Sequence, residues 1–163
     1  MWIHKDTFAI GGLENIGYAL QSDTLIVLSS QGEGLFDCKS GTKIARCYND
    51  SQWWDRFDQE TYSLFGFDFL QTTKIKTHGL YGGDTLPKVT YDHWKLVISE
   101  PKPDDKPFEN YLVRRIYLIA PDESDTFLVG KDSACELRAF GFSDTGESLV
   151  IALSSSLIIY SRV

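Results

Sequence analysis

Hydrophobic and polar positions along the chain alternate with a period of two, or form short apolar runs bounded by turn residues. Such segments are typical of β-strands, because successive side chains of a strand point to opposite faces. Near the N-terminus, the segments 25–30, 34–38 and 43–47 are separated by turns that contain glycine. Short strands joined by tight glycine-containing turns predict an antiparallel meander.

A related unit recurs along the chain. Segment 23–30 matches segment 147–155 with one insertion, and segment 91–99 is a third, weaker copy. The spacings between their first leucines, 71 and 53 residues, are too irregular for a regular array. These units resemble blades of a β-propeller of the WD-repeat or quinoprotein-like kind. Because propellers usually have about four or more blades, the resemblance leaves two arrangements open: a sandwich or open barrel of meanders, or a ring completed by self-association.

One segment predicts a helix instead of a strand. Residues 52–64 contain neither glycine nor proline, and a serine that can cap a helix precedes them. Apolar side chains, among them Trp53, Trp54 and Phe57, recur there at roughly helical spacing. We therefore expect one short helix near residues 51–65.

These patterns together predict the fold class and the number of domains. A chain of 163 residues is the usual length of one domain. The proline-rich segment 101–107 lies between two predicted strands and is interpreted as a loop within that domain. We expect a single β-rich domain over residues 1–163, all-β, built from antiparallel meander sheets in a sandwich or partial propeller-like arrangement.

The composition then excludes several classes of partner. The formal net charge is −7 and the hydrophobic fraction is 42%, so the chain is too apolar for a disordered protein. An acidic chain lacks the basic surface of a nucleic-acid binder or of a protein attached to anionic membranes. His4-Lys5-Asp6 interrupts the apolar run that a secretory signal needs, and we expect a cytoplasmic protein.

The charge is distributed unevenly. Residues 50–68 hold five acidic side chains and one arginine, a net charge of −4. Residues 100–125 hold seven acidic and four basic side chains, a net charge of −3. Residues 70–99, in contrast, carry a net charge of +2. The acidity therefore belongs mainly to the predicted helix and to one loop region.

No catalytic or metal-binding pattern stands out. The three cysteines include no Cys-x-x-Cys pair and the three histidines lack metal-ligand spacing. The glycine pairs lack the lysine and the helix of a phosphate loop, and no Gly-x-Ser-x-Gly segment occurs. We therefore expect free thiols, no catalytic residues, no metal and no cofactor.

The acidic helix also carries aromatic side chains, which supply the buried anchors of protein interfaces. Charge of one sign on a surface accelerates association with a partner of the opposite sign. The candidate partner-binding residues are Trp53, Trp54, Asp55, Asp58 and Glu60, with Asp104 and Asp105 in the acidic loop as secondary contacts.

Several segments resemble small bacterial immunity proteins that accompany toxins, namely 34–38, 43–46, 79–87 and 90–94. The resemblance implies a cytoplasmic inhibitor that occludes the active site of a cognate toxin, often a basic nuclease. Two alternatives stay open: a small enzyme or ligand-binding protein that uses the Gly79–Pro87 loop and His93, and a propeller-like scaffold that self-associates. The oligomeric state is not predicted by the sequence.

Overall fold

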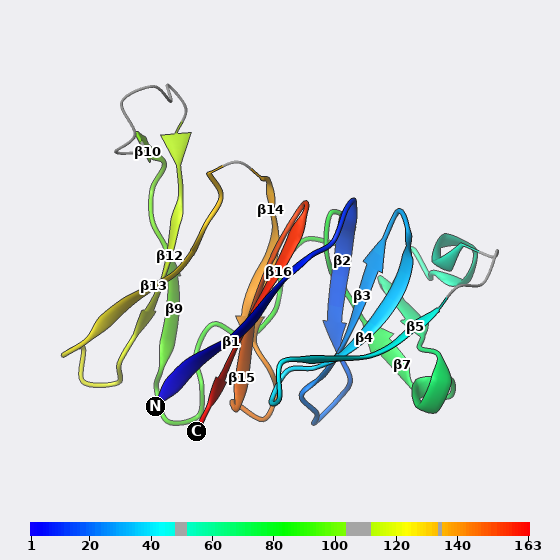
Figure 1. Ribbon diagram of the computed structural model, residues 1–163, viewed down its shortest axis with the longest axis horizontal. Helices are drawn as coiled ribbons and strands as arrows, with labels where there is room; N and C mark the ends of the chain where they lie inside the picture. The colour runs from blue at the N-terminus through cyan, green and yellow to red at the C-terminus, as the bar shows by residue number, and fades with distance from the viewer. Residues whose placement is uncertain (48–51, 104–111, 134) are drawn as a thin grey trace.

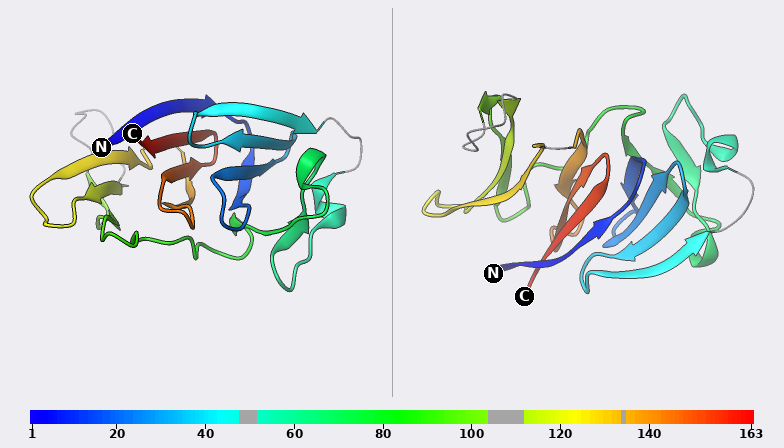
Figure 2. Two further views of the ribbon diagram at one scale, coloured as in Figure 1. Left: turned by 90° about the horizontal axis from the view of Figure 1, so that it is seen from below. Right: turned by 45° about the horizontal axis from the view of Figure 1, so that its top comes forward.

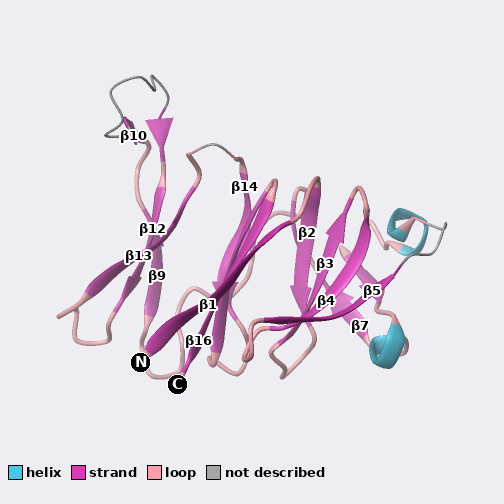
Figure 3. Cartoon of the chain, viewed as in Figure 1, coloured by secondary structure: helices cyan, strands magenta, loops and turns pink. Residues whose placement is uncertain are grey.

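Short antiparallel strands joined by turns make up the chain, shown in Figure 1 as a computed structural model. The structure describes residues 1–47, 52–103, 112–133 and 135–163. The strands are β1 (Trp2–Ala9), β2 (Leu13–Tyr18), β3 (Thr24–Ser29), β4 (Gly32–Asp37), β5 (Thr42–Cys47), β6 (Ser63–Phe65), β7 (Lys74–Lys76), β8 (His78–Gly79), β9 (Lys95–Ile98), β10 (Lys102–Pro103), β11 (Leu112–Val113), β12 (Arg115–Ile119), β13 (Thr126–Lys131), β14 (Leu137–Phe142), β15 (Ser148–Leu153) and β16 (Ser156–Arg162). Two 3-10 helices, η1 (Trp53–Arg56) and η2 (Asp68–Leu70), are the helical elements of the described residues (Figure 3). The all-β prediction is therefore confirmed.

The sheets follow one another in a row (Figure 1). The outer sheet (β13-β12-β9) lies at one end, followed by the closing sheet (β1-β16-β15-β14), the N-terminal sheet (β5-β4-β3-β2-β8) and the hairpin β6-β7. A small pair, β10-β11, extends beyond the outer sheet. In the closing sheet the first strand of the chain pairs with the last, with Trp2 opposite Arg162. Both ends of the chain therefore belong to one sheet.

Neighbouring sheets pack face to face around three apolar clusters. One cluster lies between the N-terminal and closing sheets and includes Val27, Phe36 and Val150. The others cover the outward faces of these two sheets, against η1 and β6-β7 on one side and the outer sheet on the other. Strands β3 and β15 are therefore buried on both faces, which explains their nearly uninterrupted apolar sequences.

The three related sequence segments occupy equivalent positions. β3 is the second strand of the meander β2-β3-β4-β5, and β15 is the second strand of the meander β14-β15-β16. A bridge between Val89 and Lys95 gives β9 a short preceding partner as well. One backbone hydrogen bond closes the turn before each of the three strands. The Ala19 N–H donates to the Thr24 carbonyl at 2.9 Å, the Ser143 N–H to the Ser148 carbonyl at 3.0 Å, and the Thr90 N–H to the Trp94 carbonyl at 2.9 Å. The third turn is one residue shorter than the other two.

A crossing segment, residues 80–94, returns from the N-terminal sheet to the outer sheet beneath the closing sheet (Figure 2). Part of it runs along the free edge of β14. Asp84 accepts the Phe140 N–H at 3.0 Å, and the Pro87 carbonyl accepts the Phe142 N–H at 2.8 Å. Gly141 allows this approach, because a Cβ there would lie 2.3 Å from the Leu86 Cβ. The segment thus covers a strand edge that would otherwise be open to pairing.

The short helix predicted near residues 51–65 is confined to one turn, η1, so its predicted length was wrong. Beyond η1 the Asp58 carboxylate accepts the N–H groups of Glu60 and Thr61 at 2.9 and 3.3 Å, and Tyr62 has a positive φ of 54°. The chain then pairs back from Ser63 to Asp58. Aspartate competes with helix formation by binding the backbone in this way, and a turn followed by β6 replaces the later helical turns.

The three cysteines are free; Cys38 is buried, whereas Cys47 and Cys135 are only partly buried. Within the described ranges, no helix is long and apolar enough to cross a membrane.

Candidate protein-binding surface

The two neighbouring tryptophans of η1 lie in different environments. Trp53 is 5% exposed, and its indole N–H donates to the Ser29 carbonyl at 2.9 Å. Trp54 is 36% exposed. In a tight helical turn adjacent side chains cannot share one direction, so burying Trp53 leaves Trp54 at the surface. Trp53 anchors η1 to the N-terminal sheet, whereas Trp54 is available for contact.

Trp54 belongs to a group of aromatic rings drawn from three segments. Its ring centroid lies 4.6 Å from Tyr81 and 5.5 Å from Phe57, which is buried beneath it. Tyr62, 38% exposed, lies 6.4 Å from Phe57 on another side. We call Trp54, Tyr62 and Tyr81 the aromatic surface. Rings at such distances form favourable contacts and a rigid surface.

Tyr81 reaches this position because the Gly79–Pro87 loop is fixed from below. The buried Asn15 accepts the Tyr81 N–H at 3.0 Å and donates to the Tyr81 carbonyl at 2.9 Å. Gly82, with a φ of +90°, lets the Tyr62 ring approach, since a Cβ there would lie 2.5 Å from Cγ of that ring. The glycine-rich loop and the tryptophan pair, which are separate features of the sequence, therefore meet at one surface.

Acidic side chains lie beside the aromatic surface. Asp55 and Glu60 are exposed. Asp58 holds the turn after η1, and the N–H of Glu60 that it accepts lowers its pKa. Arg56 forms a two-pronged ion pair with the buried Glu33, which raises the pKa of Arg56. Because Glu33 neutralises the one arginine in this segment, the surface stays acidic.

The other predicted residues are placed as follows. Asp104 and Asp105 lie outside the described residues. Among the described residues, six aromatic side chains are classed as exposed, and four of them fall between residues 54 and 69: Trp54, Tyr62, Phe65 and Phe69. The end of the molecule formed by η1, η2 and β6-β7 is therefore where apolar rings and carboxylates face solvent together.

The structure does not unite the two parts of the alternative site: residues of the Gly79–Pro87 loop line a cleft with His78, and His93 is not among its lining residues. His93 is exposed in the turn before β9 and has a φ of 71°. Its neighbour Asp92 binds both guanidinium nitrogens of Arg162 at 2.6 Å. The histidine close to the loop is His78, whose Nδ1 lies 3.1 Å from the Thr85 hydroxyl oxygen. In the sequence, His78 is distinguished by its position at the end of the alternating basic residues Lys74 and Lys76.

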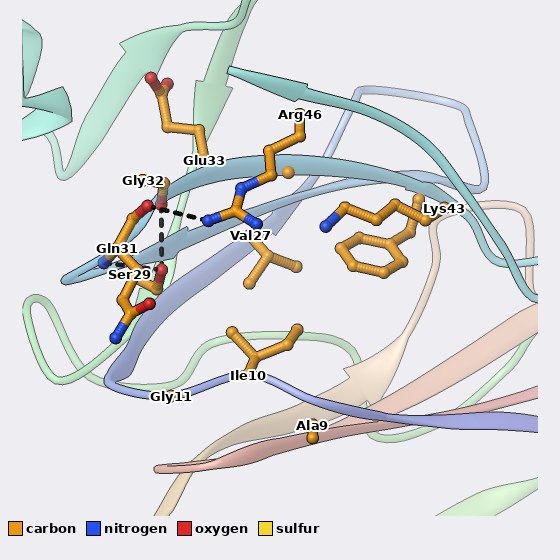
Figure 4. Close-up of a pocket in the computed structure, with 12 residues that line it drawn as sticks. Ala9, Ile10, Gly11, Val27, Ser29, Gln31, Gly32, Glu33, Lys43 and Arg46 are labelled. Atoms are coloured by element: carbon orange, nitrogen blue, oxygen red, sulfur yellow. Dashed lines mark hydrogen bonds between the residues drawn. The ribbon is translucent and has the colours of Figure 1, made fainter. Parts of the chain in front are cut away.

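A hollow of about 120 Å³ lies between the segment after β1 and the N-terminal sheet (Figure 4). Figure 4 shows the ends of Lys43 and Arg46 directed towards each other above Val27. Arg46 donates to the Gln31 carbonyl at 3.4 Å, and Lys43 lies 5.9 Å from the centre of the Phe36 ring. The hollow is thus cationic above and apolar below. Its volume suits a single small group, not a substrate of ordinary size.

The described side chains of His, Cys, Asp and Glu do not gather into groups of three that could hold a metal ion. Comparison with known proteins gives no family for the chain. No protein-family model matches it, and no curated protein or solved structure matches it either.

Proposed function

We propose that the chain is an acidic protein-binding module of the immunity type, which neutralises a basic toxin by covering its active site. The observation that carries the proposal is the coincidence of exposed rings and carboxylates around η1. Trp54 is 36% and Tyr62 38% exposed, and Asp55 and Glu60 are exposed near them. Aromatic anchors surrounded by charge are typical of the centres and rims of protein interfaces.

The mechanism follows from this arrangement. The carboxylates attract a basic cleft over several ångströms and speed encounter with it. Trp54, Tyr62 and Tyr81 then lose solvent against the partner and supply most of the affinity. Because the Asn15 side chain fixes the loop that carries Tyr81, little conformational freedom is lost on binding. Substrate is excluded by simple occupation of the cleft.

The test uses the purified product of the reading frame adjacent to this gene as partner. Affinity is measured by calorimetry at low and high salt for the wild type and for D55N/E60Q. This double variant removes two charges but keeps side-chain shape, and it spares Asp58, which holds the turn. The control, E123Q/E136Q, removes two charges at side chains that are 71% and 75% exposed, one in the turn between β12 and β13 and one just before β14.

We expect D55N/E60Q to bind about tenfold more weakly at low salt, where exposed charges are least screened, and the control to bind as the wild type does. W54A should weaken binding at both salt concentrations. Equal affinity of both double variants, or no binding of the adjacent product by the wild type, would refute the proposal.

A further inference from the structure

A cleft of about 380 Å³ lies between β7-β8, the turn before β3, the turn before β15 and the crossing segment. One of its walls is basic. Lys74, Lys76 and His78 alternate along the chain with the buried Ile75 and Thr77, so an extended backbone directs all three to one side. All three line the cleft. The mildly basic charge of residues 70–99 is therefore concentrated at one place.

His78 is prepared as a hydrogen-bond donor. The backbone N–H of Thr85 donates to its Nδ1 at 3.2 Å. A ring nitrogen that accepts a hydrogen bond carries no proton, so Nε2 of the neutral ring carries it. Burial lowers the pKa of His78 and favours this neutral form. Nε2 makes no hydrogen bond with any described residue, and His78 is 7% exposed, which leaves a largely buried N–H donor in the wall of the cleft.

The lysines retain their positive charge towards the cleft. Nζ of Lys74 forms an ion pair with the Asp58 carboxylate at 3.5 Å, and both side chains are well exposed. Exposed ion pairs of this kind contribute little free energy. Lys76 forms no ion pair with the described residues and lies close enough to His78 to lower its pKa further.

Two carboxylates lie in or near the cleft. Asp144, in the lining, accepts the Gln21 N–H at 3.2 Å. Asp84 is held by Lys88 and by the Phe140 N–H, each at 3.0 Å. The charge of Asp84 raises the pKa of His78 and partly offsets the effect of burial. In the lining itself the positive charges of Lys74 and Lys76 exceed the one negative charge of Asp144.

The remaining wall is apolar. Leu86 and Pro87 line it together with Leu20 and Tyr18. The volume falls in the range of small-molecule sites, which runs from about 300 to 1,000 Å³. Two lysine ammonium groups and the neutral N–H of His78 together suit a compact anion that carries more than one charge, such as a phosphate group. The apolar wall suits a ring or short hydrocarbon attached to that phosphate.

We propose that this cleft binds a small phosphorylated organic molecule, with its phosphate on Lys76, His78 and Lys74 and its apolar part against Leu20, Leu86 and Pro87. The cleft adjoins the aromatic surface through the Lys74–Asp58 pair, but Trp54, Tyr62 and Tyr81 are not among its lining residues, and the proposal does not depend on the proposed function.

Phenyl phosphate is the probe, and binding is followed by calorimetry and by NMR shifts of the His78 ring. The variants are K76Q and H78Q. The control is K43Q, which removes one lysine charge from the other cationic hollow. Lys76 is exposed, so K76Q is expected to fold normally, and circular dichroism checks all three variants. Benzyl alcohol, which has the ring but no charge, and inorganic phosphate, which has the charge but no ring, test the two walls separately.

We expect phenyl phosphate to bind more tightly than either partial probe and to shift the His78 ring signals. K76Q should weaken binding about tenfold or more, H78Q should weaken it less, and K43Q should leave it unchanged. The proposal fails if phenyl phosphate does not bind the wild type. It fails equally if K43Q, and not K76Q, abolishes binding, because the ligand then occupies the hollow of Figure 4.

Discussion

Asp84 holds the crossing segment against the closing sheet, and its replacement by alanine provides a quantitative test of this fold. Its carboxylate accepts three hydrogen bonds, from the N–H of Leu86 at 3.1 Å, Nζ of Lys88 at 3.0 Å and the N–H of Phe140 at 3.0 Å. Hydrogen bonds to a charged group contribute about 1.5–3 kcal/mol each, and an abandoned buried N–H costs about 1–3 kcal/mol. The three share one carboxylate and are not additive.

We therefore expect D84A to lower the free energy of unfolding by about 3 kcal/mol, since Phe140 is buried and its N–H loses its acceptor. Urea unfolding followed by tryptophan fluorescence measures the loss as a lower midpoint. Hydrogen exchange at the Phe140 amide should accelerate by more than the loss of global stability alone would produce.

The matched control is D122A. Asp122 also holds a turn, accepting the N–H of Ser124 at 3.1 Å and the Ser124 hydroxyl at 2.7 Å, but it is exposed. D122A should lower the free energy of unfolding by less than about 1 kcal/mol. A loss for D84A no larger than for D122A, or an unprotected Phe140 amide in the wild type, would refute the assignment of Asp84 as the residue that secures the β14 edge.

Three further outcomes are expected. W53F should lower stability by about 2 kcal/mol, because it leaves a buried carbonyl without its N–H donor, whereas W54F should leave the thermal midpoint nearly unchanged and weaken only partner binding. G82A should destabilise the loop in thermal unfolding, since a Cβ there would overlap a tyrosine ring. Hydrogen bonds from Arg162 hold the pKa of Asp92 well below its usual value, so their stabilisation is present above the unfolded pKa of about 3.9 and is lost as pH falls below it. Urea midpoints measured against pH should therefore drop more steeply in acid for the wild type than for D92N, and parallel curves would contradict this.

The candidate surface was only partly predictable from sequence. The sequence shows that Trp53 and Trp54 are adjacent and that acidic residues follow them. It does not show which ring is buried, because the predicted helix is replaced by a single turn and the N-terminal sheet covers one ring. Tyr81 joins the surface through Asn15, a contact between residues 66 positions apart. Contacts of that separation leave no periodic signal in a single sequence.

The sequence by itself determined the all-β class and the recurring strand unit, because alternation, apolar runs and glycine-containing turns are local properties of the backbone. Tertiary structure decided how the units combine. It paired β1 with β16, laid the crossing segment along β14, and brought the Gly79–Pro87 loop to the aromatic surface and to the basic row of Lys74, Lys76 and His78. These arrangements depend on which buried faces and open strand edges meet, and that is set by burial and hydrogen bonding between distant segments, not by any one segment alone.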